Sequence, residues 1–246
     1  MQKLMLAAAV AAITLPAAAE AQTHDWTGFY AGVTAGQGRE ADFDLDAVLE
    51  VAPEGTFFPA PLAGGTFPTQ RSFGGDGFVG GAHAGWNMQS GWLVLGGEVD
   101  LQTSDVGSSI SIPNAPGGAV NNPDGFTDLS FGIDYYGTAR ARAGVAFDWA
   151  HVYGTGGVAY GKVEFDRNYR VGAAEIRDRA TSNRTGWTVG AGAEYAVTDR
   201  ISVRGEYSRV DLGSGSFDTA YEDGTIGRAS IDTQFDVVRG GVSLRF

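Results

Sequence analysis

Arginines and carboxylates are the residues in this chain whose types and spacing could do chemistry together. Arg140 and Arg142 stand two residues apart in one segment, as Glu98 and Asp100 do in another. Side chains two apart in a β-strand point to the same face, so opposite charges on neighbouring strands would meet as ion pairs. We predict that one face of the strands carries a charge network of Glu98, Asp100, Arg140, Arg142, Glu194, Arg204, Glu206, Arg239 and Arg245.

Three histidines, His24, His83 and His151, are the candidates for acid–base catalysis or haem ligation. A serine nucleophile needs a base and a group that orients this base, and no histidine here has a serine in an evident matching position. The chain has no cysteine, which excludes thiol catalysis and disulfide bonds. We therefore predict no catalytic residue and no cofactor, and we expect His83 to act as an interior hydrogen-bonding group.

An acidic motif, Asp42-x-Asp44-x-Asp46, has the spacing with which a calcium-binding loop begins. Such a loop requires glycine at its sixth position and glutamate at its twelfth. This chain has Ala47 and Pro53 at those positions. We therefore predict no metal site, and we interpret the acidic residues as solvated surface or as a region that attracts cations.

Alternation of apolar residues with period two organises the rest of the chain and predicts β-strands. The last segment shows it best, because Val238, Val242, Leu244 and Phe246 alternate with Arg239 and Arg245 up to the final residue. Eight segments of this kind are expected to be strands: 26–38, 77–89, 92–103, 131–147, 150–165, 184–197, 200–212 and 232–246.

The fifth of these segments changes phase along its length. Val152 and Val158 favour one face, whereas Val163 and Phe165 favour the other. An extra residue in a strand reverses the face on which the following side chains lie. We therefore predict a β-bulge near Gly161.

The connections alternate between short and long, as in an up-and-down meander. Short turns are expected at 90–91, 148–149 and 198–199, and long connections at 39–76, 104–130, 166–183 and 213–231. A soluble sandwich could cover the apolar face with a second sheet, whereas a membrane barrel exposes it to lipid. Strands of about ten residues suit a tilted membrane span. We predict an all-β fold: an eight-stranded antiparallel up-and-down transmembrane β-barrel with four long extracellular loops and three short periplasmic turns.

The first 21 residues have the pattern of a secretory signal peptide. Lys3 precedes an apolar run, and Ala19-Glu20-Ala21 forms a small-x-small cleavage site. We assign residues 1–21 to a cleaved signal peptide and residues 22–246 to the barrel domain. The chain is therefore expected to be exported to the outer membrane. Its net charge of −12 argues against a nucleic-acid partner.

Several stretches carry a family resemblance: "WTGFYAGVTAG", "GTARARAGVAF", "YGTGGVAYG", "GWTVGAGAEYAVTDRISVRGEYSRVDLG" and the final "VSLRF". With these the chain resembles the eight-stranded outer-membrane β-barrel family, and more closely the opacity-like surface antigens and porin-like proteins of alphaproteobacteria. The resemblance implies that Val242, Leu244 and Phe246 form the signal by which the barrel-assembly machinery recognises its clients.

The resemblance implies a structural or surface-antigen role in envelope integrity and external contacts. The alternatives are a porin-like channel for small solutes and a surface protein that binds haem or another ligand through its loops. We expect the charge network to plug the lumen, because an eight-stranded barrel is about filled by its own side chains. Outer-membrane lipids, lipopolysaccharide and the assembly machinery are the expected partners, and a host or extracellular ligand is not identified by the sequence.

Overall fold

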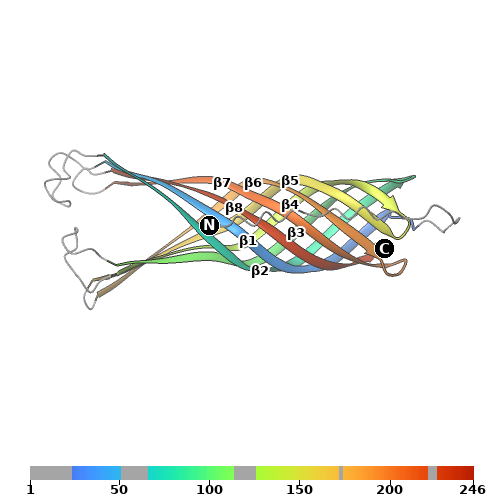
Figure 1. The fold of residues 1–246 in the computed structure, drawn as a ribbon, viewed down its shortest axis with the longest axis horizontal. Coiled ribbons are helices and arrows are strands. Elements are labelled where there is room, and N and C mark those ends of the chain that lie inside the picture. The colour runs from blue at the N-terminus through green and yellow to red at the C-terminus, as the bar shows by residue number, and fades with distance from the viewer. Residues whose placement is uncertain (1–23, 51–65, 114–125, 172–173, 221–225) are drawn as a thin grey trace, which may run out of the picture.

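A computed structural model describes residues 24–50, 66–113, 126–171, 174–220 and 226–246 (Figure 1). The predicted signal peptide lies outside these ranges. Within them the chain forms eight strands: β1 (Gly28–Glu50), β2 (Thr66–Ser90), β3 (Leu93–Pro113), β4 (Phe126–Phe147), β5 (Ala150–Val171), β6 (Ala174–Ala196), β7 (Ile201–Ala220) and β8 (Ile226–Arg245). The part of the chain described here contains no helix long and apolar enough to cross a membrane.

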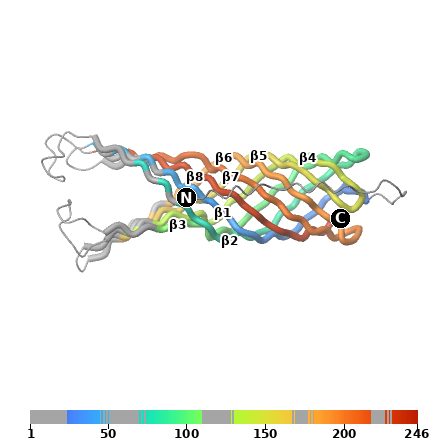
Figure 2. Tube along the Cα trace, viewed as in Figure 1, coloured from blue at the N-terminus to red at the C-terminus, as the bar shows by residue number. Residues whose placement is uncertain are grey.

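The eight strands form a closed antiparallel barrel, which confirms the predicted fold class. Each strand pairs with the next in sequence, as the tube in Figure 2 shows, and β8 returns to pair with β1 through partners such as Val33 and Val242. Short turns at 91–92, 148–149 and 197–200 join β2 to β3, β4 to β5 and β6 to β7. Gly91 and Asp148 have positive φ angles of 60° and 53°, which a tight hairpin turn requires. We call this end of the barrel the turn end, and the opposite end the loop end.

The strands are longer than the sequence predicts, at 20 to 25 residues each. The predicted long connections are therefore largely strand, and β1 and β2 alone occupy much of the range 39–76. What remains of these connections lies outside the described residues. At ~3.3 Å per residue and a tilt of ~40°, 20 residues rise about 50 Å, whereas the apolar band of a membrane barrel is ~25 Å tall. About half of each strand therefore extends beyond the lipid.

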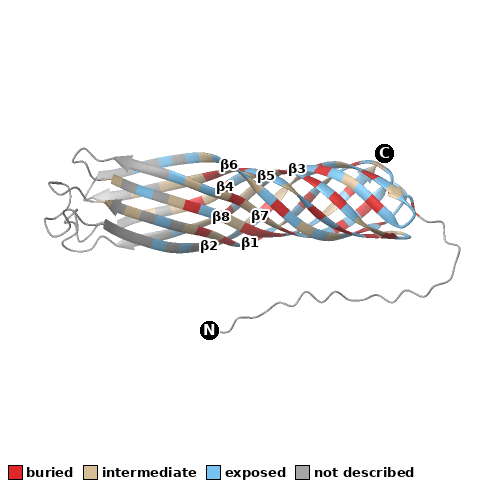
Figure 3. Ribbon diagram, turned by 90° about the horizontal axis from the view of Figure 1, so that it is seen from above, coloured by how far each residue is buried: buried red, intermediate tan, exposed pale blue. Residues whose placement is uncertain are grey.

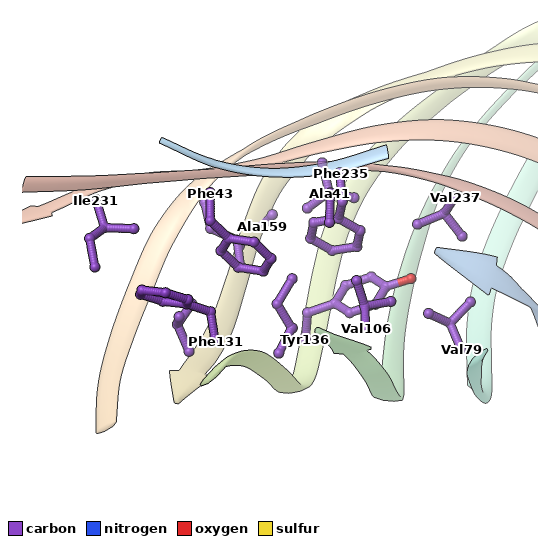
Figure 4. Packing of buried hydrophobic residues seen from close by; sticks show 14 residues of the cluster. Ala41, Phe43, Val79, Val106, Phe131, Tyr136, Ala159, Ile231, Phe235 and Val237 are labelled. Atoms are coloured by element: carbon purple, nitrogen blue, oxygen red, sulfur yellow. The ribbon is translucent and has the colours of Figure 1, made fainter. Parts of the chain in front are cut away.

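The apolar face reverses between the two halves of the barrel. In the turn-end half the outward side chains are apolar and exposed, as Phe29 at 67% and Val99 at 57% show. Figure 3 shows buried and exposed positions alternating along the strands in this half. In the loop-end half the apolar side chains point inward, where Phe43 of β1 stacks on Phe131 of β4 with ring centroids 5.9 Å apart (Figure 4). This apolar core comprises Ala41, Phe43, Val79, Val106, Phe131, Ile133, Tyr136, Ala159, Val163, Val210, Leu212, Ile231, Phe235 and Val237.

Bulges help to produce the reversal, and none of those in the described residues lies on β5, where the sequence predicts one. The register of β1 shifts between Gly38 and Ala41, and that of β4 shifts against β5 between Ile133 and Tyr135. Further shifts occur in β3 between Thr103 and Val106 and in β7 between Asp211 and Ser214.

The predicted bulge near Gly161 is wrong in its strand, because β5 pairs with β6 without a register shift and the extra residue lies on β4, opposite Lys162 and Val163. The sequence predicts that Val163 faces outward to lipid. This side chain faces inward, because the apolar surroundings at this level of the barrel are the protein core.

Above the apolar band the barrel divides along two seams. β6 and β7 pair from Ala196 up to Trp187 opposite Asp211, and no described residue beyond them continues this ladder. β2 and β3 likewise stop pairing at Asp76 opposite Gly107. The loop end therefore consists of two four-stranded sheets, β7-β8-β1-β2 and β3-β4-β5-β6, which form two separate groups in Figure 1.

We predict that Phe235→Ala destabilises the protein by about 3–5 kcal/mol, because a buried aromatic ring is lost and a cavity remains. Phe235 is 1% exposed and packs edge-on against Tyr136 with ring centroids 5.2 Å apart. Urea unfolding of protein refolded in phospholipid vesicles measures the change. Asn183→Ala, at an exposed position of β6, is the control and should change stability by less than about 0.5 kcal/mol.

Candidate functional site

The barrel interior brings together eight of the nine residues of the predicted charge network. These eight side chains are buried and come from β3, β4, β6, β7 and β8: Glu98, Asp100, Arg140, Arg142, Glu194, Arg204, Glu206 and Arg239. Four acids face four arginines, so the formal charges balance within the group. Arg245 lies apart from them, at the turn end.

Strand register places three of the acids directly opposite an arginine. Glu98 pairs with Arg140 across β3 and β4, and Glu206 pairs with Arg239 across β7 and β8. Glu194 lies opposite Arg204 across β6 and β7. Residues opposite each other in an antiparallel pair are close enough for their side chains to interact, so backbone pairing alone puts unlike charges side by side.

Glu98 is the centre of the network. Its Oε1 accepts a hydrogen bond from Arg140 Nη2 at 2.5 Å, and its Oε2 accepts one from Arg204 Nη1 at 2.5 Å. The hydroxyl of Tyr30 donates to the same carboxylate at 2.9 Å. Arg204 reaches Glu98 from the other side of the barrel, so this cluster crosses the interior and does not merely line its wall.

Two further acids connect the network towards the loop end. Arg140 Nη1 and Arg239 Nη2 each donate to Oε1 of Glu206 at 2.6 Å. Asp100 accepts from the hydroxyl of Thr138 at 2.6 Å and lies 3.1 Å from Arg140 Nη2. Arg140 thus contacts three carboxylates, and its removal would leave three acids without one of their partners.

Arg142 connects the network to the turn end. Its guanidinium donates to Glu194 and lies 3.6 Å from the ring centroid of Tyr153. Glu194 also accepts a hydrogen bond from Ser202 at 2.5 Å. Gly192 leaves the space for Tyr153, because a Cβ at this glycine would lie 2.6 Å from the tyrosine ring. The barrel interior around Arg142 is therefore packed with side chains.

Residues 24–27, which we call the N-terminal plug, fill the interior at the turn end. Trp26 is fully buried, and its backbone N–H donates to Gln89 Oε1 at 2.8 Å. Arg245 lies 4.6 Å from the Trp26 ring centroid and donates to the backbone carbonyl of Asp25 at 2.7 Å. His24 stacks on Trp149 at 5.0 Å. The alternating pattern predicts Trp26 as the start of the first strand, and nothing in that pattern indicates that Trp26 turns into the barrel.

The histidines do not form a catalytic site with the residues described. His83 Nε2 lies 2.9 Å from Ser243 Oγ, but no described group accepts from its Nδ1, so the orienting member of a triad is absent from this part of the chain. His151 is fully buried beside Trp26 and Arg142.

The described residues also hold no group of three or more histidines or acids placed for a metal ion. In the acidic motif, Asp42 and Asp44 lie on the extended strand β1, where Asp44 accepts a hydrogen bond from Ser72 at 2.5 Å. A straight strand carries alternate side chains along a line, whereas a calcium loop wraps its ligands around the ion.

The outer face carries the predicted assembly residues and one arginine. Val242, Leu244 and Phe246 are all exposed on the outer face at the end of β8. Arg209 of β7 points outward just beyond Tyr207, where it donates to Gln234 at 2.7 Å and pairs with Asp236 at 3.3 Å. Polar pairs at this level mark the upper limit of the lipid-facing band.

A closed antiparallel barrel with an apolar outer belt and a polar interior defines an outer-membrane β-barrel protein. A family model, described as the outer membrane protein beta-barrel domain, matches residues 5–246. The chain belongs to this family and is a surface and structural protein of the outer membrane.

Relatives agree with this assignment. The 31 kDa outer-membrane immunogenic protein of Brucella melitensis is 32% identical over 242 residues, covering 94% of this chain and 88% of the relative. The 22 kDa outer membrane protein of Rhizobium leguminosarum is 32% identical over 187 residues, covering 72% and 77%. Among solved structures, OprG from Pseudomonas aeruginosa shares the fold with a TM-score of 0.50 at 13% identity, covering 92% of this chain and 98% of OprG.

We predict that Glu98→Gln destabilises the barrel by about 3–5 kcal/mol, because two buried guanidinium groups lose the charge that they share. Urea unfolding in vesicles gives the change in free energy. Asp148→Asn, in an exposed turn, is the control and should have little effect. An unchanged unfolding midpoint for Glu98→Gln would show that the network contributes nothing to stability.

The N-terminal plug should weaken in acid. Burial, and next the Arg245 guanidinium, hold the pKa of His24 below its ordinary value of 6.5, although Asp199, Asp25 and Asp148 oppose this. The unfolded chain therefore binds more protons than the folded one below about pH 6.5, so stability from this group falls as the pH falls.

We expect the wild type to lose more stability between pH 7.5 and pH 5 than His24→Gln does, measured by urea unfolding of both proteins at each pH. Other titrating groups are common to both proteins and cancel in the comparison. Equal losses would mean that His24 does not link the plug to pH.

Proposed function

We propose that the protein is a sealed barrel that supports the outer surface of the cell and does not conduct solutes. The observation that carries this proposal is the filling of the interior at three successive levels. The N-terminal plug fills the turn end, the charge network fills the middle, and the apolar core fills the loop-end half. A hydrated ion would have to displace all three.

The porin-like alternative has less support. An eight-stranded barrel leaves an interior just wide enough for its own side chains. Here the interior includes four arginines whose guanidinium groups already meet carboxylates at 2.5–2.6 Å or pack on a tyrosine ring. Water-filled porins have twice as many strands. The size of this barrel and its ion pairing both favour a plug.

The surface role is supported by the length of the strands. Extension of each strand beyond the apolar band would hold the loop end well outside the lipid, with the turn end in the periplasm. The relatives from Brucella are named for their immunogenicity, which suits a protein exposed at the cell surface. We propose the same exposure for this chain.

The partners proposed for the outer face are lipids and the assembly machinery. Outer-membrane lipids would contact the apolar belt, and lipopolysaccharide would meet the polar level of Arg209. Val242, Leu244 and Phe246 are accessible at the end of β8, as an assembly signal requires. We propose no catalytic role, because the His83–Ser243 pair has no orienting acid among the described residues.

Conductance of the refolded protein in a planar bilayer tests the proposal. We expect no steady openings from wild-type protein whose folding is shown by heat-shifted gel mobility. Steady wild-type openings whose size or ion selectivity changes in Arg140→Ala or Glu194→Ala would show that the lumen conducts and that porin is the better description.

A further inference from the structure

Arg184 of β6 is a buried cation that forms no ion pair with the described residues. The residue is 5% exposed, and its Nη1 donates to the backbone carbonyls of Ile231 at 2.6 Å and Gly213 at 3.4 Å. Its Nε has no hydrogen-bond partner. A guanidinium has five N–H donors, so the two carbonyls use only part of its capacity. Burying a charge without an opposite charge is costly.

This side chain lies at the base of the seam between β6 and β7. The ladder between these strands ends at Trp187 opposite Asp211, three residues before Arg184 is reached. The carbonyls that Arg184 contacts belong to β7 and β8. Arg184 therefore reaches from one four-stranded sheet across the seam to the other.

The backbone of β7 makes room for the guanidinium. Gly213 has a φ of +67°, and the register of β7 against β8 shifts between Asp211 and Ser214. A Cβ on Gly215 would lie 2.3 Å from Nη2 of Arg184 and 2.4 Å from its Cζ. A larger residue at position 215 would displace the guanidinium, so this glycine keeps the cation in the seam.

The nearest acids are engaged elsewhere or exposed. Asp211 accepts the backbone N–H of Gly213 at 2.7 Å, and Asp232 of β8 is exposed to solvent. Neither forms an ion pair with Arg184 in the part of the chain that the structure describes. Asp232 acts on the charge of Arg184 from beyond ion-pair distance, and the buried Nε of Arg184 still has no hydrogen-bond partner among the described residues.

The two sides of the seam differ in character. Towards the interior, Leu212 and Ile231 are buried members of the apolar core. Towards the outside, Trp187 is 48% exposed at the upper edge of the lipid-facing belt. Arg184 thus lies between the membrane boundary and an apolar interior, an arrangement that suits a ligand with one charged end and one apolar end.

We propose that the β6–β7 seam binds a single-chain amphiphile with one anionic head group, a carboxylate or a phosphate. The head group pairs with the unused donors of Arg184, which match the two oxygens of such an anion. The apolar chain lies outside the core, against the exposed Trp187 at the edge of the lipid-facing belt. The ligand reaches the seam from the outer leaflet without passing through the lumen, so the proposal is independent of whether the barrel conducts.

Binding of cis-parinaric acid, a fluorescent long-chain carboxylate, to the refolded protein in maltoside micelles tests this proposal. We expect saturable binding by the wild type and a dissociation constant raised about tenfold or more in Arg184→Gln, which corresponds to about 1.4 kcal/mol. Arg200→Gln, in an exposed turn at the other end of the barrel, is the matched control and should bind as the wild type does. The methyl ester, which has the same chain without the charge, should bind at least about tenfold more weakly.

Equal binding of the ester, or an unchanged dissociation constant in Arg184→Gln, would overturn the proposal and leave Arg184 as a cap on backbone carbonyls. Displacement of the probe by millimolar inorganic phosphate would show an anion site that needs no apolar chain, and would overturn it as well. If Arg184→Gln does not show heat-shifted mobility, Arg184→Lys replaces it. That variant keeps the charge but loses the planar fork, and it should also bind more weakly.

Discussion

Backbone hydrogen bonding is the constraint on which the rest of this structure depends. Hydrocarbon offers no partner to an N–H or a carbonyl group, so every strand must be paired on both edges within the lipid. Closure of β1 on β8 meets this requirement. Both seams begin at the upper edge of the apolar belt or above it, after Trp187 and after Asp76, where water can satisfy unpaired edges. The surrounding solvent thus explains where the barrel can divide.

Closure also creates a narrow interior, and the two halves of the barrel fill it by different means. In the lipid-facing half the outer surface takes the apolar residues, which leaves polar side chains for the inside. Strand register then sets Glu98 against Arg140 and Glu206 against Arg239, so the charges compensate each other. In the outer half the surroundings are aqueous, and the interior becomes an ordinary apolar core around Phe43, Phe131 and Phe235. The same eight strands therefore face lipid in one half of the barrel and water in the other.

The sequence was sufficient for the barrel and for the inward face of its charged residues, because alternation with period two records which side meets lipid. It was insufficient in the loop-end half, where apolar residues face a protein core instead of lipid. Val163 points inward to this core, and the alternation pattern alone predicts a bulge at this position. The contact of Arg204 with Glu98 depends on the diameter of the closed barrel, and the burial of Trp26 depends on a chain end that turns inward. Neither leaves a local pattern.

The core of the loop-end half has a consequence for how the chain can diverge. Since this half has its own packed interior, it separates the outer ends of the strands from the membrane anchor. Insertions and replacements in the connections between these ends need not disturb the lipid contacts, the ion pairs or the exposed end of β8. A population under pressure from antibodies or phage could therefore renew the outermost epitopes of such a protein while its biogenesis and anchoring stay the same.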